Sequence, residues 1–359
     1  MLKALDIWLP AYCRRTQDDR PATGPRHLML CICDHFEPFH HAGKKEALER
    51  VHTWREQFPK LAEPFRDSGG ARPKQTFFYP IEQYDPDVLE GISGLCRASG
   101  CETEIHLHHH GDTAENLRKT LELGKENFTR HNLLSQDEQG RTRYGFIHGN
   151  WALDNSDPFG RHCGVRNELL VLNETGCYAD FTLPSAPKRT QTKIINSLYY
   201  ATGTLRPKSH NRGTLVEAGK KPSGDLLIIQ GPLGLNWNKR KFGFLPGIEN
   251  GDLTSKNPPT LERLRIWMDL HIHVRGRPGW FFVKLHTHGA IQPNSSLFLG
   301  KQMQKFHHDL ARFADENTGF HFHYVTAREM ANILHAAEDG HSGSPGDFRD
   351  YRYQSRIRN

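Results

Sequence analysis

The stretch RHLMLCICDHFEP, residues 26–38, decides the fold. Its run LMLCIC is short and continuously apolar and ends at an acidic cluster, which is typical of a buried strand in a parallel sheet. A helix is predicted near residues 44–58, because apolar side chains recur there at spacings of three or four, namely Ala47, Val51, Trp54 and Phe58. A buried strand followed by an amphipathic helix is the repeating unit of an α/β fold.

The same alternation continues along the chain. Further strands are predicted at QTFFYP (75–80), TEIHLHH (103–109), YGFIHG (144–149), CYADFTL (177–183), DLLIIQG (225–231), GWFFVKLH (279–286) and FHFHYV (320–325). Helices are predicted from Pro86, over the segment with Leu117, Leu121 and Phe128, near 165–175, 191–201, 260–270 and 299–315, and from Thr326, where Glu329 completes a capping box. About eight strands favour a closed or nearly closed (β/α) barrel of seven to eight strands over an open doubly wound sheet.

One large domain is expected to carry most of the chain. Residues 1–26 are predicted to form an N-terminal extension, residues 27–337 the barrel, and residues 338–359 a flexible basic tail. Two stretches rich in Gly, Pro, Lys and Asn, at 202–224 and 231–259, are predicted to be long loops over one mouth of the barrel.

The composition excludes several classes of protein. Hydrophobic residues make up 36% of the chain and charged residues 25%, as in a globular enzyme. The net charge of +6 comes without a basic stripe that contains aromatics, so a nucleic-acid partner is not expected. No run approaches the roughly 20 apolar residues of a membrane span, and the N-terminus makes a poor signal sequence. The seven cysteines show no CxxC spacing and are expected to be reduced and mostly buried, so a cytoplasmic location is predicted.

Polar side chains gather where the predicted strands end. In an α/β barrel these carboxyl ends open onto a shared cleft, so we expect the side chains to converge. They are Asp34, His35 and Glu37 after the first strand, His106, His108, His109, His110 and Asp112 at the third, His148, Asn150, Trp151 and Asp154 at the fourth, Asp180 at the fifth, and Lys284, His286 and His288 at the penultimate strand. Imidazole and carboxylate ligands suit a divalent ion, with zinc the expected one, and a catalytic site needs about three of them.

Some of these residues have a simpler structural explanation. Asp112 followed by Glu115 fits the start of a helix, so Asp112 is a candidate N-cap as well as a candidate ligand. A histidine such as His148 is more often a hydrogen-bonded structural group than a ligand. Trp151 and Trp237 are candidates for the core and also for flat surfaces that bind a sugar ring.

With these positions assigned, the chain resembles the polysaccharide deacetylase superfamily, the NodB-homology group of carbohydrate esterases. The order of elements is similar over residues 27–335, from CDHFE and TFFYP through GCETEIHLHHH to the late LHTH and YVTAREM. The resemblance implies a distorted TIM-like barrel of the glycoside hydrolase and deacetylase type. It also implies a divalent ion held by one Asp and two His, a second Asp as base and a late His as acid.

The resemblance places the metal ligands in the first and third strands. Asp34 matches the acidic motif, and His106 with His110 matches the His-x-x-x-His motif. His108 with Asp112 has the same spacing, so the register of the histidines stays open between these two pairs.

The resemblance also suggests the catalytic groups. The family's adjacent Asp-Asp pair reads Asp34-His35 here, so Glu37 is the candidate for the second carboxylate, and Asp34 or Glu37 would act as base. His286 or His288 matches the late histidine that acts as acid. Substrate contacts are expected from the residues after the fourth and fifth strands, which are His148, Asn150, Trp151, Asp154 and Asp180.

The function expected from these residues is metal-dependent hydrolysis of an acyl group, an N-acetyl above all, on a sugar or polysaccharide. One alternative is a glycoside hydrolase on the same barrel, which would need two carboxylates such as Asp34 or Glu37 with Asp154 or Asp180. A second alternative is a sugar- or metal-binding protein without catalysis, because the family's second Asp is missing.

Overall fold

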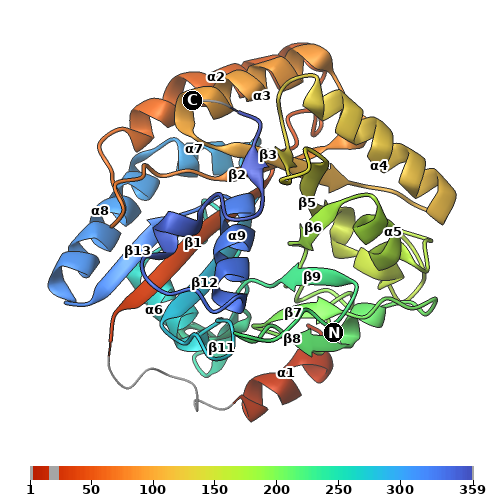
Figure 1. Cartoon of the computed structure of the whole chain (residues 1–359). Coiled ribbons are helices and arrows are strands. Elements are labelled where there is room, and N and C mark those ends of the chain that lie inside the picture. The colour runs from red at the N-terminus through yellow and green to blue at the C-terminus, as the bar shows by residue number, and fades with distance from the viewer. Residues whose placement is uncertain (1–2, 16–23, 358–359) are drawn as a thin grey trace.

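The protein is built around one large sheet, seen in a computed structural model that describes residues 3–15 and 24–357 (Figure 1). The strands are ordered β12-β1-β2-β3-β5-β6-β9-β7-β8, and β13 also pairs with β1. All eight strands predicted from sequence are present, as β1 (Arg26–His35), β2 (Thr76–Pro80), β3 (Glu102–Leu107), β5 (Thr142–His148), β6 (Cys177–Asp180), β9 (Leu226–Ile229), β12 (Trp280–Thr287) and β13 (Phe320–Tyr324). The pairs among them are parallel.

The sheet is not closed, so the predicted (β/α) barrel is not confirmed. Beyond β9 it continues with β7 (Leu198–Ala201) and β8 (Gly213–Leu215), which pair antiparallel and end the sheet. Residues 272–275 lie between the two ends of the sheet: Arg275 N donates to Val216 O, next to β8, at 3.0 Å, and Phe282 N of β12 donates to Ile272 O at 2.8 Å. The fold is therefore a mixed α/β architecture with a mostly parallel central sheet.

For residues 191–259 one prediction is wrong and two are incomplete. The helix expected at 191–201 is strand β7 in its second half, because Tyr199 and Tyr200 pair with β9 and pack in the core. The loop expected at 202–224 contains β8. The loop expected at 231–259 contains a two-stranded hairpin of β10 (Gly234–Lys241) and β11 (Leu245–Glu249).

Helices cover one face of the sheet, and a single helix covers the other (Figure 1). The first group comprises α2 (Lys44–Ala62), α3 (Pro86–Ser99), α4 (Ala114–Thr129), α5 (Glu168–Glu174), α6 (Leu261–Leu270), α7 (Asn294–Phe298) and α8 (Lys301–Glu316). Strand alternation sends Leu28, Leu30 and Ile32 of β1 toward this layer. Met29, Cys31 and Cys33 point the opposite way, into a cluster with α9 (Ala327–Glu338), every residue of which is buried.

The helix start signals are confirmed at two positions and wrong at a third. Asp85 caps α3, and Thr326 with Glu329 forms the predicted capping box of α9. At α4 the N-cap is Thr113, whose hydroxyl accepts from Asn116 N, and not Asp112. The remaining short elements are 3-10 turns at Ile81–Gln83, Gly149–Trp151, Leu153–Asn155, Ser209–Asn211 and Pro345–Phe348.

Both ends of the described chain pack on the domain. In the N-terminal extension, α1 (Leu5–Arg14) buries Trp8 against Leu233. Over residues 338–357 the predicted flexible tail is instead held in place, with β14 (Gln354–Ser355) pairing with β4 (Ser135–Gln136) and with the Arg328 side chain donating to Arg349 O and Tyr353 O. Residues 1–2, 16–23 and 358–359 lie outside the described part. Within the described ranges, no helix is both long and apolar enough to cross a bilayer.

Candidate functional site

Three buried side chains converge at the carboxyl ends of β1 and β3. His35, Glu37 and His106, which we call the His35 cluster, have ligand atoms that all lie within 4.8 Å of one another. His35 is the last residue of β1, and Glu37 lies in the turn that follows. His106 is the second-to-last residue of β3. The closest pair is Nε2 of His106 and Oε1 of Glu37, at 3.1 Å.

The His106 ring is oriented as metal-binding imidazoles are. Its Nδ1 lies 2.8 Å from the carbonyl oxygen of Ile147, to which it donates a hydrogen bond. In the neutral ring Nε2 then carries a lone pair, and this lone pair faces a carboxylate oxygen of Glu37. Two acceptors at this distance need a proton or a cation between them. A backbone carbonyl that fixes the tautomer of a histidine is a common partner of metal ligands, so the residues fit a divalent ion.

More imidazole surrounds the His35 cluster. His108 Nε2 lies 3.4 Å from Glu37 Oε1, and its Nδ1 lies 2.7 Å from Glu82 Oε1. From the end of β12, the His288 ring lies 4.7 Å from the His35 ring and the His286 ring 6.3 Å from it, centre to centre. His108 and His288 are half-buried, so this side of the cluster is the one that reaches solvent.

The charges of the site follow from burial and these contacts. Burial would raise the pKa of Glu37, but the close contact with His106 and the other nearby histidines outweighs it and lowers the pKa to about 2. Burial lowers the pKa of His288 and that of His35. Glu82 and Glu37 overcome the burial of His108 and raise its pKa. The site therefore combines an ionised carboxylate with neutral His35 and His288 at neutral pH.

Asp34, the expected metal ligand, does not join these residues. By strand alternation its side chain lies on the face of Ile32, toward the outer helices, whereas His35 points the other way. Both oxygens are engaged there, Oδ1 by Gly289 N at 2.6 Å and Oδ2 by Gln75 Nε2 at 3.2 Å. Burial raises the pKa of Asp34 to about 7. The imidazole of His35 takes the position at the cluster that the sequence suggested for Asp34.

The expected pairs His106 with His110 and His108 with Asp112 are both divided by the structure. Strand β3 ends at Leu107, and the chain then bends, with Gly111 at φ 59°. His110 is exposed and its Nδ1 accepts from His162 N at 3.1 Å, so it lies away from His106. Asp112 lies beside His109, with Oδ2 2.9 Å from Nδ1.

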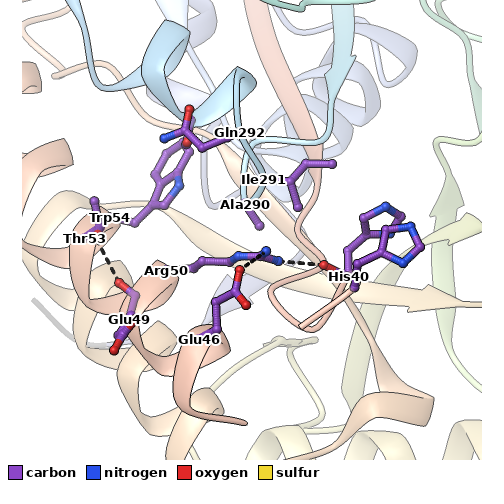
Figure 2. Close-up of a pocket in the computed structure, with 11 residues that line it drawn as sticks. His40, Glu46, Glu49, Arg50, Thr53, Trp54, Ala290, Ile291 and Gln292 are labelled. Carbon is purple, nitrogen blue, oxygen red and sulfur yellow. Dashed lines mark hydrogen bonds and ion pairs between the residues drawn. The ribbon is translucent and has the colours of Figure 1, made fainter. Parts of the chain in front are cut away.

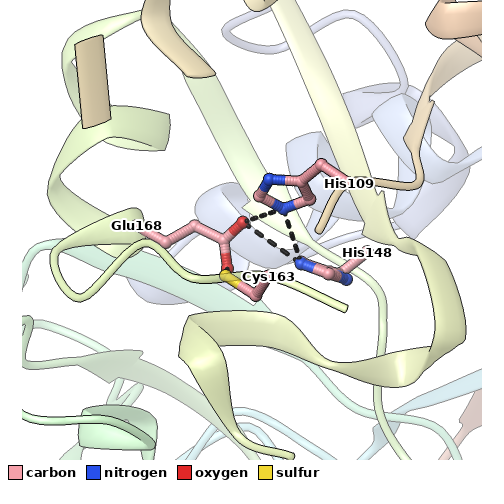
Figure 3. Close-up of side chains that lie close together, drawn as sticks. All are labelled: His109, His148, Cys163 and Glu168. Carbon is pink, nitrogen blue, oxygen red and sulfur yellow. Dashed lines mark hydrogen bonds and ion pairs between the residues drawn. The ribbon is translucent and has the colours of Figure 1, made fainter. Parts of the chain in front are cut away.

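The next residue along, His109, points into a second convergence (Figure 3). His109, His148, Cys163 and Glu168, which we call the His148 cluster, also have ligand atoms within 4.8 Å of one another. They come from the segment after β3, the end of β5, the loop that follows, and the first residue of α5. Consecutive residues, His108 and His109, thus serve two different clusters.

The five expected substrate residues are dispersed. His148 belongs to the His148 cluster. Asp154 is fully buried and accepts from Ser209 Oγ at 2.6 Å, and Asp180 is fully buried and accepts from Thr182 Oγ1 at 2.7 Å. Burial raises the pKa of Asp180 to about 7. Neither carboxylate is open to a substrate, which corrects both assignments.

Trp151 lies at the solvent side of the His35 cluster, and Asn150, the residue before it, is half-buried. The Trp151 ring centre is 5.8 Å from that of His35 and 6.1 Å from that of His288. Lys188 Nζ lies 4.2 Å from the Trp151 ring centre, a cation–π contact. Trp237, the other candidate, is 54% exposed on β10 of the hairpin.

A pocket of about 500 Å³ lies behind the turn that carries Glu37 (Figure 2). It lies between α2 and residues 290–295. In it Arg50 donates to the carbonyl oxygens of Pro38 and His40, both at 2.9 Å, and holds the turn after β1. His40, which lines this pocket, places its Nδ1 3.7 Å from Glu37 Oε2, so the pocket borders the His35 cluster.

Comparison with known proteins adds no relative: no protein-family model matches the chain, and no curated protein matches it significantly. The site therefore stands on its geometry. Sequence reasoning assigned no ligand role to His35, Cys163 or Glu168. His35 directly follows Asp34 at a strand end, which was the available signal; Cys163 and Glu168 lie in a loop and at a helix start, where no spacing pattern distinguishes them.

Proposed function

We propose that the protein is a metal-dependent hydrolase that removes an acyl group, most simply an N-acetyl, from a sugar or polysaccharide. The single observation that carries the proposal is the His35 cluster with His288 beside it. One carboxylate and two imidazoles from separate strand ends meet there, and a further imidazole faces solvent next to them. The resemblance to the polysaccharide deacetylases supplies the class of reaction.

His35, Glu37 and His106 would hold the ion, with Zn²⁺ proposed because nitrogen and oxygen ligands of this kind suit it. A bound divalent ion polarises an acyl carbonyl and lowers the pKa of a water molecule to near 7. Glu37 is ionised under all relevant conditions, and its position is fixed by His106 and His108.

His288 would move the proton. Because burial keeps its ring neutral at neutral pH, a ring nitrogen can accept the proton of the water that attacks the acyl carbon. When the C–N bond breaks, the same nitrogen returns this proton to the leaving amine, so that a free amine and a carboxylic acid, which then ionises in solution, are released. The half-buried position of His288 gives it access to substrate that the fully buried His286 lacks.

Trp151 would bind the sugar. Its half-buried ring lies beside His35 and His288 and offers an apolar face to a pyranose. Lys188 over the ring would favour a substrate with acidic groups.

The test is the release of acetate from N-acetylated oligosaccharides by the purified full-length protein. We expect release that stops in chelator, returns with Zn²⁺, and is lost in Glu37→Gln and His106→Ala, while Glu115→Gln, on an exposed helix position, retains it. Formation of new reducing ends that continues in chelator, without release of acetate, would instead favour a glycosidase with two carboxylates. Binding of acetylated glycans without any turnover would favour the non-catalytic alternative.

A further inference from the structure

We propose that His109, His148, Cys163 and Glu168 form a second metal site, a closed structural site for Zn²⁺, separate from the His35 cluster. This inference does not depend on the proposed hydrolase activity. It rests on the contacts among four side chains that two loops, a strand end and a helix start bring together (Figure 3).

Three acceptor atoms crowd together at the centre of the His148 cluster. Nε2 of His109 lies 2.8 Å from Nε2 of His148 and 3.0 Å from Oε1 of Glu168. Nε2 of His148 lies 3.3 Å from the same Oε1. Two ligand atoms on one tetrahedral zinc ion are separated by roughly 3.3 Å, given metal–ligand distances of about 2.0–2.1 Å. The observed separations therefore need little change to accommodate the ion.

Each ring is already oriented to present Nε2 to this centre. His109 directs Nδ1 to Asp112 Oδ2 at 2.9 Å, and His148 directs Nδ1 to its neighbour Gly149 O at 2.6 Å. A carboxylate and a backbone carbonyl are the two usual partners of the distal nitrogen in zinc-bound histidines. In this orientation the two Nε2 lone pairs face each other and the Glu168 carboxylate. Three acceptors this close repel one another unless a shared proton or a cation lies between them.

Cys163 supplies the fourth ligand and makes zinc the fitting ion. Its sulfur lies 3.6 Å from Oε2 of Glu168 and is fully buried. Two nitrogens, one oxygen and one sulfur form a donor set that suits borderline-soft Zn²⁺ better than Mg²⁺ or Ca²⁺. A thiolate and a carboxylate carry two negative charges in a place that water does not reach. A divalent cation would balance both charges there.

The burial of the four side chains indicates a structural site. His148, Cys163 and Glu168 have no exposed surface, and the side chain of His109 is 7% exposed. With four protein ligands and almost no exposed surface, the site lacks the open position that catalysis at zinc requires.

The backbone between these ligands explains what the ion would stabilise. Between His148 and Glu168 the chain has several non-glycine residues in the left-handed region, which L-residues adopt at a cost. They are Asn150, Trp151, Asp154, Asn155 and His162. An ion bound at both ends and in the middle of this segment would hold it in place, and Trp151 with it.

The test uses the sulfur, because the His35 cluster contains none. The full-length protein is stripped with chelator and reloaded with Co²⁺ alone, and its absorption spectrum is recorded. We expect a thiolate-to-Co²⁺ charge-transfer band in the near ultraviolet that persists in His106→Ala and disappears in Cys163→Ala. Cys96→Ala removes another buried thiol, hydrogen-bonded to Thr103, and should keep the band.

A second measurement does not depend on the fold of the cysteine variant. X-ray absorption at the zinc edge of zinc-loaded His106→Ala should show one sulfur at about 2.3 Å among lighter ligands. If this spectrum shows no sulfur ligand and the wild type shows no thiolate band, the proposed zinc site is wrong. A shared proton would then hold the side chains of the His148 cluster together. Loss of acetate release with the thiolate band intact would contradict the hydrolase proposal and not this one.

Discussion

Nε2 of His106 lies 3.1 Å from Oε1 of Glu37, although 69 residues separate them in the chain. The contact exists because β2 lies between β1 and β3 and brings their carboxyl ends to one edge of the sheet. The side chain of Glu82, in the turn after β2, completes the arrangement by holding His108.

The two late histidines should differ in their effect on catalysis. His288→Asn removes the half-buried imidazole that would carry the proton, so we expect kcat for acetate release to fall by about 10²–10⁴-fold with little change in KM. His286→Asn is the matched control, because His286 is buried behind it, and should cost less. Equal losses in kcat for both variants would contradict the role of His288.

Trp151→Ala should act on binding. Removal of the ring from beside His35 and His288 should raise KM for an acetylated oligosaccharide roughly 2- to 13-fold, as expected for an aromatic contact worth about 0.5–1.5 kcal/mol. Trp237→Ala removes an exposed ring from the hairpin and should leave KM unchanged. An unchanged KM in Trp151→Ala would remove this residue from the substrate site.

Glu104 should make the protein less stable as the pH rises. Burial raises the pKa of this carboxyl to about 8, above the 4.5 of an unfolded chain, although Tyr178 and Gly145 N donate to it. Between these two values the folded protein holds a proton that the unfolded chain releases, so the stabilisation is complete below pH 4.5 and is lost as the pH passes 8.

Urea unfolding at pH 5 and pH 8 measures this effect. The wild type should lose more free energy of unfolding between the two values than Glu104→Gln does, and Asp34 and Asp180, whose pKa values burial also raises, account for the remaining loss. Glu115→Gln, an exposed control, should follow the wild type. The idea fails if Glu104→Gln keeps the full pH dependence.

The C-terminal segment should contribute strongly to stability through Arg328. Its guanidinium pairs with Glu102 at 2.6 Å and with Asp350 at 2.6 Å, while its side chain is only 4% exposed. Arg328→Met would leave the Glu102 carboxylate without its partner, and we expect the free energy of unfolding to fall by about 3–5 kcal/mol. Arg118→Met, which removes an exposed pair with Glu174, should cost less than about 1 kcal/mol. The prediction is wrong if chemical denaturation gives a loss in the free energy of unfolding for Arg328→Met that is as small as the loss for Arg118→Met.

Local sequence patterns predicted most of the strands and helices. They failed where contacts between distant segments determine the structure. Each of the eight parallel strands is a short apolar run with clear boundaries, so it was visible in the sequence. The failure of the sheet to close depends on how residues 272–275 fit between β8 and β12, and none of these segments encodes this alone. The residues around SLYYA were predicted as a helix because the antiparallel pairing that makes them a strand comes from β9.

The site was predicted in part for the same reason. Glu37, His106, His108 and His288 lie together because strand ends in a parallel sheet share an edge, which the sequence implies. The exchange of Asp34 for His35 depends on which face of β1 turns inward at its last residue. The position of His110 depends on the bend after Leu107, and the roles of Cys163 and Glu168 on a loop whose path has no repeating pattern.

The adjacency of His108 and His109 joins the two clusters through one peptide unit. An ion that shifts the backbone at His109 would also shift His108, and with it the contact between His108 Nε2 and Glu37 Oε1. By thermodynamic linkage any such influence is reciprocal, so that occupancy of either centre changes the affinity of the other by the same factor. Binding of ions at the His35 cluster and the His148 cluster would then be cooperative. The total free energy of binding both ions would not depend on which cluster is filled first.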